Sequence, residues 1–220
     1  MNPLTTAQLD RLTALFHAGA ADASTALSRW LVRDARVQVN SIEQLSIAEA
    51  SSLLGASDVP WCACVMGVEG FLTGKMLFCF DDASGLQLCR YLIDESSDSI
   101  GNGSNGEVEP MQWSELETSA ARETANIVGS AYVSSLTESM SSGPLLPTPP
   151  IFVREYAASL IEFAIMDQMV NSDQVLFTRT QFYIDGTPIL WSLLLIPDAT
   201  SLEVLSDWLK PPSRIGKEQS

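Results

Sequence analysis

The heptapeptide FDDASGL at residues 80–86 is paralleled by IPDATSL at residues 196–202. In each, an apolar strand end is followed by an acidic residue and then by the start of a helix. The same order of elements precedes both, which predicts two copies of an α-β-α-β-β-α unit, at about 4–94 and 113–209. We expect a single domain over residues 1–220, of the α/β (α+β) class. Its two copies are predicted to be related by a pseudo-two-fold axis and to share one mixed sheet flanked by long helices.

The segments around these anchors have the composition and periodicity of helices and strands. The first copy is predicted to contain helices at 10–33, 46–54 and 83–93 and strands at 37–42, 61–68 and 71–80. The second is predicted to contain helices at 114–140, 157–167 and 201–209 and strands at 151–156, 175–184 and 189–196. A turn at Asp185-Gly186 joins the last two strands into a hairpin. Residues 95–112, rich in Ser, Gly, Asn and acidic side chains, are predicted to be a flexible linker.

The chain is strongly acidic, with 27 acidic against 12 basic residues and a formal net charge of −15. Such a surface repels phosphate backbones and anionic lipid, so we expect no nucleic-acid partner and favour proteins with basic patches. The first residues lack the basic and apolar parts of a signal peptide. The apolar run at 189–196 is too short to span a bilayer. We therefore expect a cytoplasmic protein with no membrane insertion.

The cysteines do not have the pattern of a metal site. All four, Cys62, Cys64, Cys79 and Cys89, lie in apolar stretches of the first half, and the only histidine is the distant His17. A structural zinc site needs about four ligands at close spacing. We expect buried free thiols, as in a reducing compartment, and no bound metal.

The helix at 114–140 has two different faces. At about 100° per residue, apolar side chains gather on one side and predict the face that packs on the core. These are Leu116, Ala120, Ala121, Ile127, Val128, Ala131 and Tyr132. Ser119, Glu123 and Asn126 gather on the other side, where a carboxylate and a carboxamide three residues apart project together. Taken alone, this pattern is also typical of an ordinary solvated helix face.

The stretch from Glu123 to Tyr132 resembles the active helix of the CheC, CheX and FliY chemotaxis phosphatases, and the whole chain is closest to CheC. The family motif has Asp or Ser, three residues, Glu, two residues and Asn, followed by a proline about one β-connection later. Ser119, Glu123 and Asn126 match it position by position. Pro147 and Pro149 bracket the expected proline. The resemblance extends over about residues 4–209.

A second, altered version of the motif lies on the first long helix. The stretch from His17 to Ser28 is similar to the family's Asn-Ile-Gly-Ala-Gly-Asn-Ala-Ala-Thr-Ala-Leu-Ser. Asp10 is in place, but Ala14 stands where Glu is expected and His17 where Asn is expected. No proline lies at the matching distance. We therefore expect a degenerate first site, with His17 exposed and merely polar.

The resemblance implies a phosphatase that accelerates hydrolysis of phospho-aspartate on a CheY-type response regulator in chemotaxis signalling. Asn126 would orient the attacking water, Glu123 would pair with a lysine of the receiver, and Ser119 would support them. The protein would need no cofactor of its own, since the Mg²⁺ belongs to the receiver. Two alternatives stay open: a non-catalytic regulator-binding or flagellar-switch adaptor, and a partner of a CheD-type deamidase.

Overall fold

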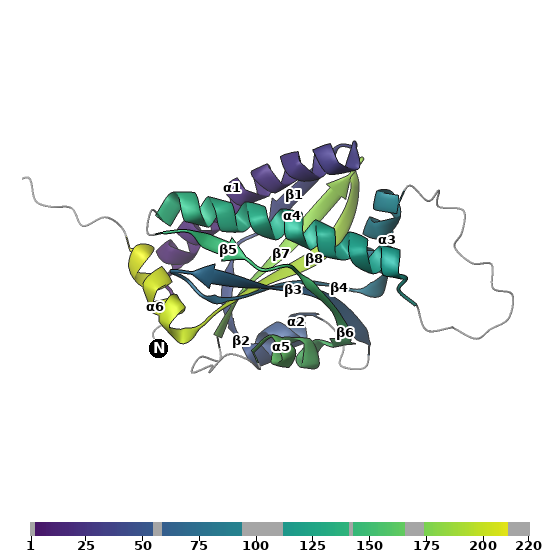
Figure 1. Cartoon of the computed structure of the whole chain (residues 1–220). Coiled ribbons are helices and arrows are strands. Elements are labelled where there is room, and N and C mark those ends of the chain that lie inside the picture. Colours follow the sequence, from purple (N-terminus) through teal and green to yellow (C-terminus); the bar gives the residue numbers. More distant parts are fainter. Residues whose placement is uncertain (1–2, 55–58, 94–111, 141–142, 166–173, 211–220) are drawn as a thin grey trace, which may run out of the picture.

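The computed structural model describes residues 3–54, 59–93, 112–140, 143–165 and 174–210. Two long helices, α1 (Thr6–Leu31) and α4 (Glu115–Met140), lie side by side across one face of a sheet, and two short ones, α2 (Ile47–Leu54) and α5 (Ala157–Ile165), cover part of the other face (Figure 1). The helices α3 (Asp82–Ile93) and α6 (Ala199–Trp208) lie toward opposite ends of the layer that α1 and α4 form. No helix in the described ranges is long and apolar enough to cross a membrane.

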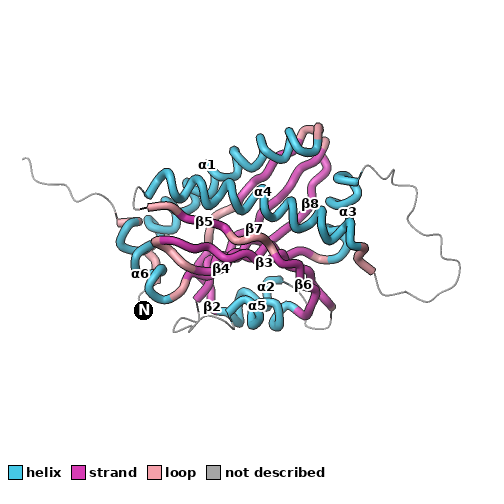
Figure 2. Tube along the Cα trace, viewed as in Figure 1, coloured by secondary structure: helices cyan, strands magenta, loops and turns pink. Residues whose placement is uncertain are grey.

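A single eight-stranded sheet forms the centre of the molecule (Figure 2). Its strands are β1 (Ala35–Val39), β2 (Glu43–Ser46), β3 (Pro60–Gly70), β4 (Gly74–Phe80), β5 (Leu145–Pro147), β6 (Ile151–Tyr156), β7 (Gln174–Ile184) and β8 (Thr187–Pro197). They lie in the order β1-β7-β8-β4-β3-β5, with β2 also on β7 and β6 also on β3. The predicted α/β architecture, one sheet flanked by long helices, is confirmed.

The prediction of a mixed sheet was wrong, because every pairing among the described strands is antiparallel. Helix α2 connects β2 to β3, but these strands are not neighbours: β2 pairs with β7, whereas β3 pairs with β4, β5 and β6. A helix between two strands therefore does not create a parallel crossover here.

The two edges of the sheet are built in the same way, each from two short strands that pair with one long strand. Strands β1 and β2 from the first predicted copy pair with β7, and β5 and β6 from the second pair with β3. Strands β4 and β8 pair in the middle. This order agrees with two related copies, and the two-fold repeat itself stays a prediction. The predicted linker at 95–112 lies, apart from Gln112, outside the described residues.

The acidic residue of each heptapeptide begins a helix, as predicted. A carboxylate oxygen of Asp81 accepts a hydrogen bond from the backbone N–H of Ser84 at 2.7 Å, and Asp198 does the same for Ser201 at 2.7 Å. Such caps satisfy N–H groups that have no partner within the helix. Aligned end to end, the two heptapeptides place Asp82 opposite Asp198. The structure instead makes Asp81 the equivalent of Asp198, which is a shift of one residue.

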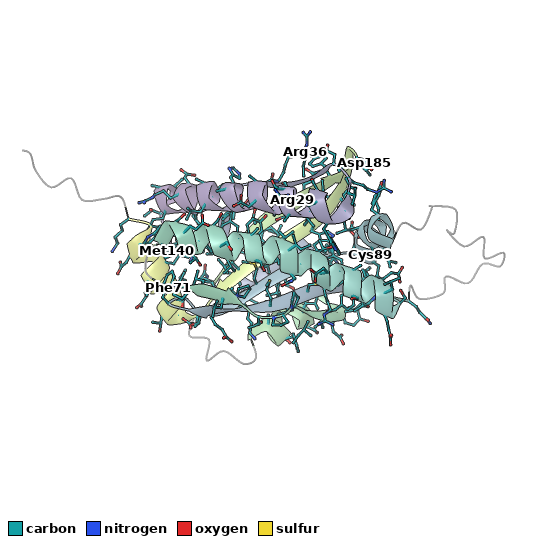
Figure 3. The ribbon with its side chains drawn as sticks, turned by 45° about the horizontal axis from the view of Figure 1, so that its top comes forward. Arg29, Arg36, Phe71, Cys89, Met140 and Asp185 are labelled. Carbon is teal, nitrogen blue, oxygen red and sulfur yellow. The ribbon has the colours of Figure 1, made fainter. Side chains whose placement is uncertain are left out.

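The long helices pack closely through small residues and aromatic rings. The rings of Phe16 and Tyr132 stack with their centroids 5.0 Å apart. Gly19 allows this approach, because a Cβ at that position would lie 2.6 Å from Cδ1 of Tyr132. Figure 3 shows α1 and α4 in front of the sheet, with Cys89 of α3 beside α4 and Met140 toward the other end of α4.

The four cysteines are free and buried, as predicted. Burial raises the pKa of the Cys79 and Cys89 thiols to about 12 and that of the Cys62 and Cys64 thiols well above its ordinary value. They are protonated at neutral pH, so they behave as small core side chains and not as nucleophiles.

Candidate functional site

Helix α4 orients the three motif residues away from the core. It begins with a capping box, in which Ser114 and Glu117 satisfy each other's backbone N–H groups. Further along, Ala121, Ala125, Val128 and Tyr132 are buried against the sheet and α1. On the other side Ser119 and Glu123 are exposed, and Asn126 is half-buried. The predicted placement of the motif residues on one accessible face is what the structure shows.

One residue of the predicted core face is misplaced. Leu116 is 58% exposed. It lies seven residues before Glu123, which is about 20° short of two full helical turns, so both side chains project on the same outward face. An exposed leucine two turns from the motif residues therefore belongs to the accessible side of α4.

A short proline-rich segment lies opposite the motif and forms a groove with it. The groove has a cavity volume of about 290 Å³. Its lining consists of Ser119, Arg122, Glu123, Asn126, Pro147, Pro149 and Pro150. The structure thus brings together all three motif residues and both prolines that bracketed the expected position. Sequence reasoning missed Arg122 and Pro150. The run Pro-Thr-Pro-Pro at 147–150 could have pointed to Pro150.

The proline segment is attached on two sides. Thr148 carries its only backbone N–H group, which donates to the carbonyl oxygen of Gly67 at 2.9 Å. The Thr148 hydroxyl accepts from the N–H of Gly67 at 2.7 Å. From α4, Nε of Arg122 donates to the carbonyl oxygen of Pro150 at 2.8 Å. Because proline also fixes φ, this side of the groove has little conformational freedom.

The motif side chains have no partners within the described part of the chain. The side chains of Ser119, Glu123 and Asn126 make no hydrogen bond or ion pair to any residue that the structure describes. An amide, a carboxylate and a hydroxyl that are accessible, close together and uncommitted can bind an external group. They lie beside a rigid segment that fixes the width of the groove.

The first long helix uses the corresponding positions differently. The N–H at Nε2 of His17 donates to the carbonyl oxygen of Val39 at 2.9 Å. Thr13 accepts from the N–H of Ile42 at 3.1 Å, and Ser24 accepts from the N–H of Val37 at 2.8 Å. Side chains of α1 thus satisfy backbone groups of β1 and of the segment that follows it.

His17 is therefore more than an exposed polar residue. It lies in a second open depression, which is lined by His17, Ala20, Ala21, Val37, Gln38, Val39 and Asn40. Asp10 and Ala14, the other residues of the predicted degenerate site, are exposed but do not line it. These three residues share one exposed face of α1, but only His17 lines the depression, whereas Ser119, Glu123 and Asn126 all line the groove on α4.

Within the described residues, no group of three or more His, Cys, Asp or Glu side chains is placed to hold a metal ion. One ionic cluster among the described residues is structural: Arg154 of β6 binds Asp82 of α3 through two hydrogen bonds, at 2.9 and 2.7 Å. The indole N–H of Trp113 donates to the same carboxylate at 2.8 Å. Burial alone would raise the pKa of Asp82, but the Arg154 guanidinium and the Trp113 indole hold that pKa below its ordinary value.

No family model matches the sequence. FliY from Thermotoga maritima superposes with a TM-score of 0.72 at 16% identity, over 94% of this chain and 98% of its own. The FliM middle domain from H. pylori gives 0.65 at 12% identity, over 93% and 99%. A chain of the FliG–FliM complex from H. pylori gives 0.64 at 11% identity, over 93% and 100%. The protein therefore has the fold of T. maritima FliY and the H. pylori FliM middle domain, and the resemblance to FliY is confirmed at the level of the fold.

Proposed function

We propose that the protein accelerates the hydrolysis of phospho-aspartate on a CheY-type response regulator. The observation that carries the proposal is the groove of α4, where Ser119, Glu123 and Asn126 are uncommitted and face a fixed proline segment. The FliY-like fold supports it, since the sequence motif stands on the corresponding kind of scaffold. Chemotaxis signalling in the cytoplasm is the proposed setting.

The chemistry requires little from the protein beyond positioning. Phospho-aspartate is an acyl phosphate: water attacks phosphorus, the bond from phosphorus to the aspartate oxygen breaks, and the electron pair leaves with the carboxylate. The proton of the water passes to the released phosphate or to solvent. Placing the water in line with the breaking bond supplies most of the acceleration. The Asn126 amide suits this task, because it both accepts and donates hydrogen bonds and does not titrate.

Glu123 is proposed to fix the docking of the regulator. A carboxylate on an exposed helix face pairs well with a lysine of the partner through a charge-assisted hydrogen bond. The net charge of −15 favours approach of a basic surface in the same way. Ser119, one turn before Glu123, is assigned a supporting hydrogen bond. The metal that phosphoryl transfer needs is assigned to the receiver.

The decisive experiment measures the decay of purified phospho-receiver with and without the protein. Glu123→Ala is expected to weaken binding to the receiver, whereas Glu138→Ala is the matched control, because Glu138 is also exposed on α4 but does not line the groove. If the protein leaves the decay rate unchanged, the proposed hydrolysis is wrong. If both variants bind the receiver alike, the role assigned to Glu123 is wrong.

A second candidate is a regulator-binding or flagellar-switch protein without catalytic activity. The likeness to the FliM middle domain and to a chain of a FliG–FliM complex favours it. Such a protein would bind a receiver or a switch component and leave phospho-receiver decay unchanged, so the same experiment separates the two. A CheD-type deamidase as a further partner remains a prediction.

A further inference from the structure

We propose that Arg122, which lies outside the sequence motif, binds the phosphoryl group in the groove. This inference rests on the proposed function, since it names the part of the substrate that the groove recognises. Among the residues that line the groove, Arg122 is the cation and Glu123 the anion. Without Arg122 the groove would present only negative and neutral groups to a phosphoryl dianion.

The position of the guanidinium is set by one hydrogen bond. Its Nε donates to the carbonyl oxygen of Pro150 at 2.8 Å, which holds the side chain across the groove. A guanidinium has five N–H donors, so four remain on the two terminal nitrogens. Arg122 is exposed and forms no ion pair with any acid in the described ranges. Planar pairs of N–H donors of this kind match phosphate oxygens well.

Helix geometry places this cation beside the amide. Arg122 and Asn126 are four residues apart and so neighbours on the helix surface, whereas Arg122 and Glu123 differ by about 100°. The cation therefore lies next to Asn126 on the proline side, and the carboxylate lies on the outer side. A phosphoryl group at Arg122 would have its attacking water within reach of Asn126, while Glu123 stays free to meet a lysine of the partner.

The competing explanation is that Arg122 only holds the proline segment in place through its hydrogen bond to the Pro150 carbonyl. Two substitutions separate the alternatives. Arg122→Gln removes the charge but keeps an amide that can donate to the Pro150 carbonyl. Arg122→Lys keeps the charge but loses the planar fork. If Arg122 binds phosphate, the Lys variant should retain more function than the Gln variant; a purely structural role predicts the reverse, or equal losses.

The test compares binding to a CheY-type receiver loaded with beryllofluoride and Mg²⁺, which mimics the phosphorylated state, with binding to the same receiver unloaded. Arg122→Gln should weaken binding to the loaded receiver by about tenfold or more and leave binding to the unloaded receiver unchanged. The affinity of Arg122→Lys for the loaded receiver should lie between those of Arg122→Gln and the wild type. Arg29→Gln, an exposed arginine on α1, is the matched control and should change neither affinity.

Salt supplies an independent readout, because the preference of the wild type for the loaded receiver should decrease with ionic strength more steeply than that of Arg122→Gln. Equal affinities of Arg122→Gln and wild type for the loaded receiver would overturn the inference. If the wild type accelerates decay and prefers the loaded receiver while Arg122→Gln matches it in both, only the role of Arg122 falls. If the wild type neither accelerates decay nor binds the loaded receiver, the proposed function falls with it.

Discussion

Asn126 and His17 are matched in sequence but differ in what their side chains contact. His17 is bound to the Val39 carbonyl at the edge of β1, and Asn126 has no partner in the described part of the chain. The difference follows from the segments opposite. Next to His17 the edge presents ordinary backbone groups that need partners, whereas next to Asn126 three of the residues at 147–150 are prolines. The one backbone N–H group in this segment, that of Thr148, already donates to Gly67, so no N–H group there needs an acceptor from α4. The Asn126 amide therefore has no structural role in that contact.

Replacing His17 should therefore affect stability and not hydrolysis. His17→Ala leaves the Val39 carbonyl without its side-chain partner, which we expect to lower the free energy of unfolding by about 0.5–1.5 kcal/mol. Urea denaturation measures this loss. Asp10→Ala, exposed on the same helix, should be neutral. A His17→Ala variant of unchanged stability that loses phospho-receiver hydrolysis would make His17 a functional residue and contradict this assignment.

Thr148 tests whether the rigidity of the proline segment matters. Thr148→Val removes the hydroxyl that accepts from Gly67, so we expect a loss of about 1 kcal/mol in stability. The factor by which the protein speeds phospho-receiver decay should also fall several-fold. Thr148→Ser keeps the hydroxyl and should behave as the wild type. The comparison is made in the same decay assay. Full activity in Thr148→Val would show that the groove works without this attachment.

The long helices and the hairpins could be predicted from the sequence, because each has a strong local signal. Helix α4 has a buried, largely apolar side from Ala120 to Met140. The turn at Asp185 and Gly186 has the positive φ values, 49° and 83°, that Asp-Gly favours in a hairpin. Strands β2 and β5 were missed. They have four and three residues, too few for an alternating pattern, and their pairing with β7 and β3 depends on residues more than 70 positions away.

The carboxylate of Asp82 connects α3 to β6 and to Trp113, two residues before α4, and this connection should depend on pH. The pKa of Asp82 is held below its ordinary value in the folded protein. Its contribution is therefore present above the unfolded-state pKa of about 3.9 and is lost as the pH falls through the lower folded-state pKa. Asp82→Asn should lower stability by about 1–3 kcal/mol at pH 7 and by progressively less below pH of about 4.

Denaturant midpoints of the wild type and of Asp82→Asn, measured from neutral to acidic pH, check this sign. Asp22→Asn is the control, since Asp22 is exposed on α1, and its denaturant midpoint at neutral pH should be close to that of the wild type. A constant difference between Asp82→Asn and wild type at all pH values would mean that the ionised carboxylate contributes nothing beyond the shape of the side chain.

At the scale of the whole molecule, the two predicted copies complete each other's part of the sheet. The N-terminal half supplies β1 and β2 to β7, and the C-terminal half supplies β5 and β6 to β3. This exchange could not be foreseen from local patterns, because pairing partners across the sheet are decided by tertiary packing. The groove also depends on both halves, since Thr148 at its wall is attached to Gly67 of β3.

Separated halves should therefore fail to fold alone. Fragments 1–94 and 95–220 each expose strand edges and lack half of the core under α1 and α4, so we expect neither to unfold cooperatively by itself. Mixing them should restore the near-ultraviolet circular dichroism of the intact chain, because Trp191 and its aromatic neighbours Phe80 and Phe182 come from both halves. A cooperative transition in either fragment alone would show two independent domains.

Asn126 is proposed to position the water that hydrolyses phospho-aspartate. The most direct test is the decay of phospho-receiver in the presence of wild type or Asn126→Ala at equal concentration. We expect accelerated decay with the wild type and the receiver's intrinsic rate with Asn126→Ala. Stability and binding should be unchanged, because a half-exposed side chain without partners among the described residues contributes little to folding. Equal acceleration by both proteins would contradict it.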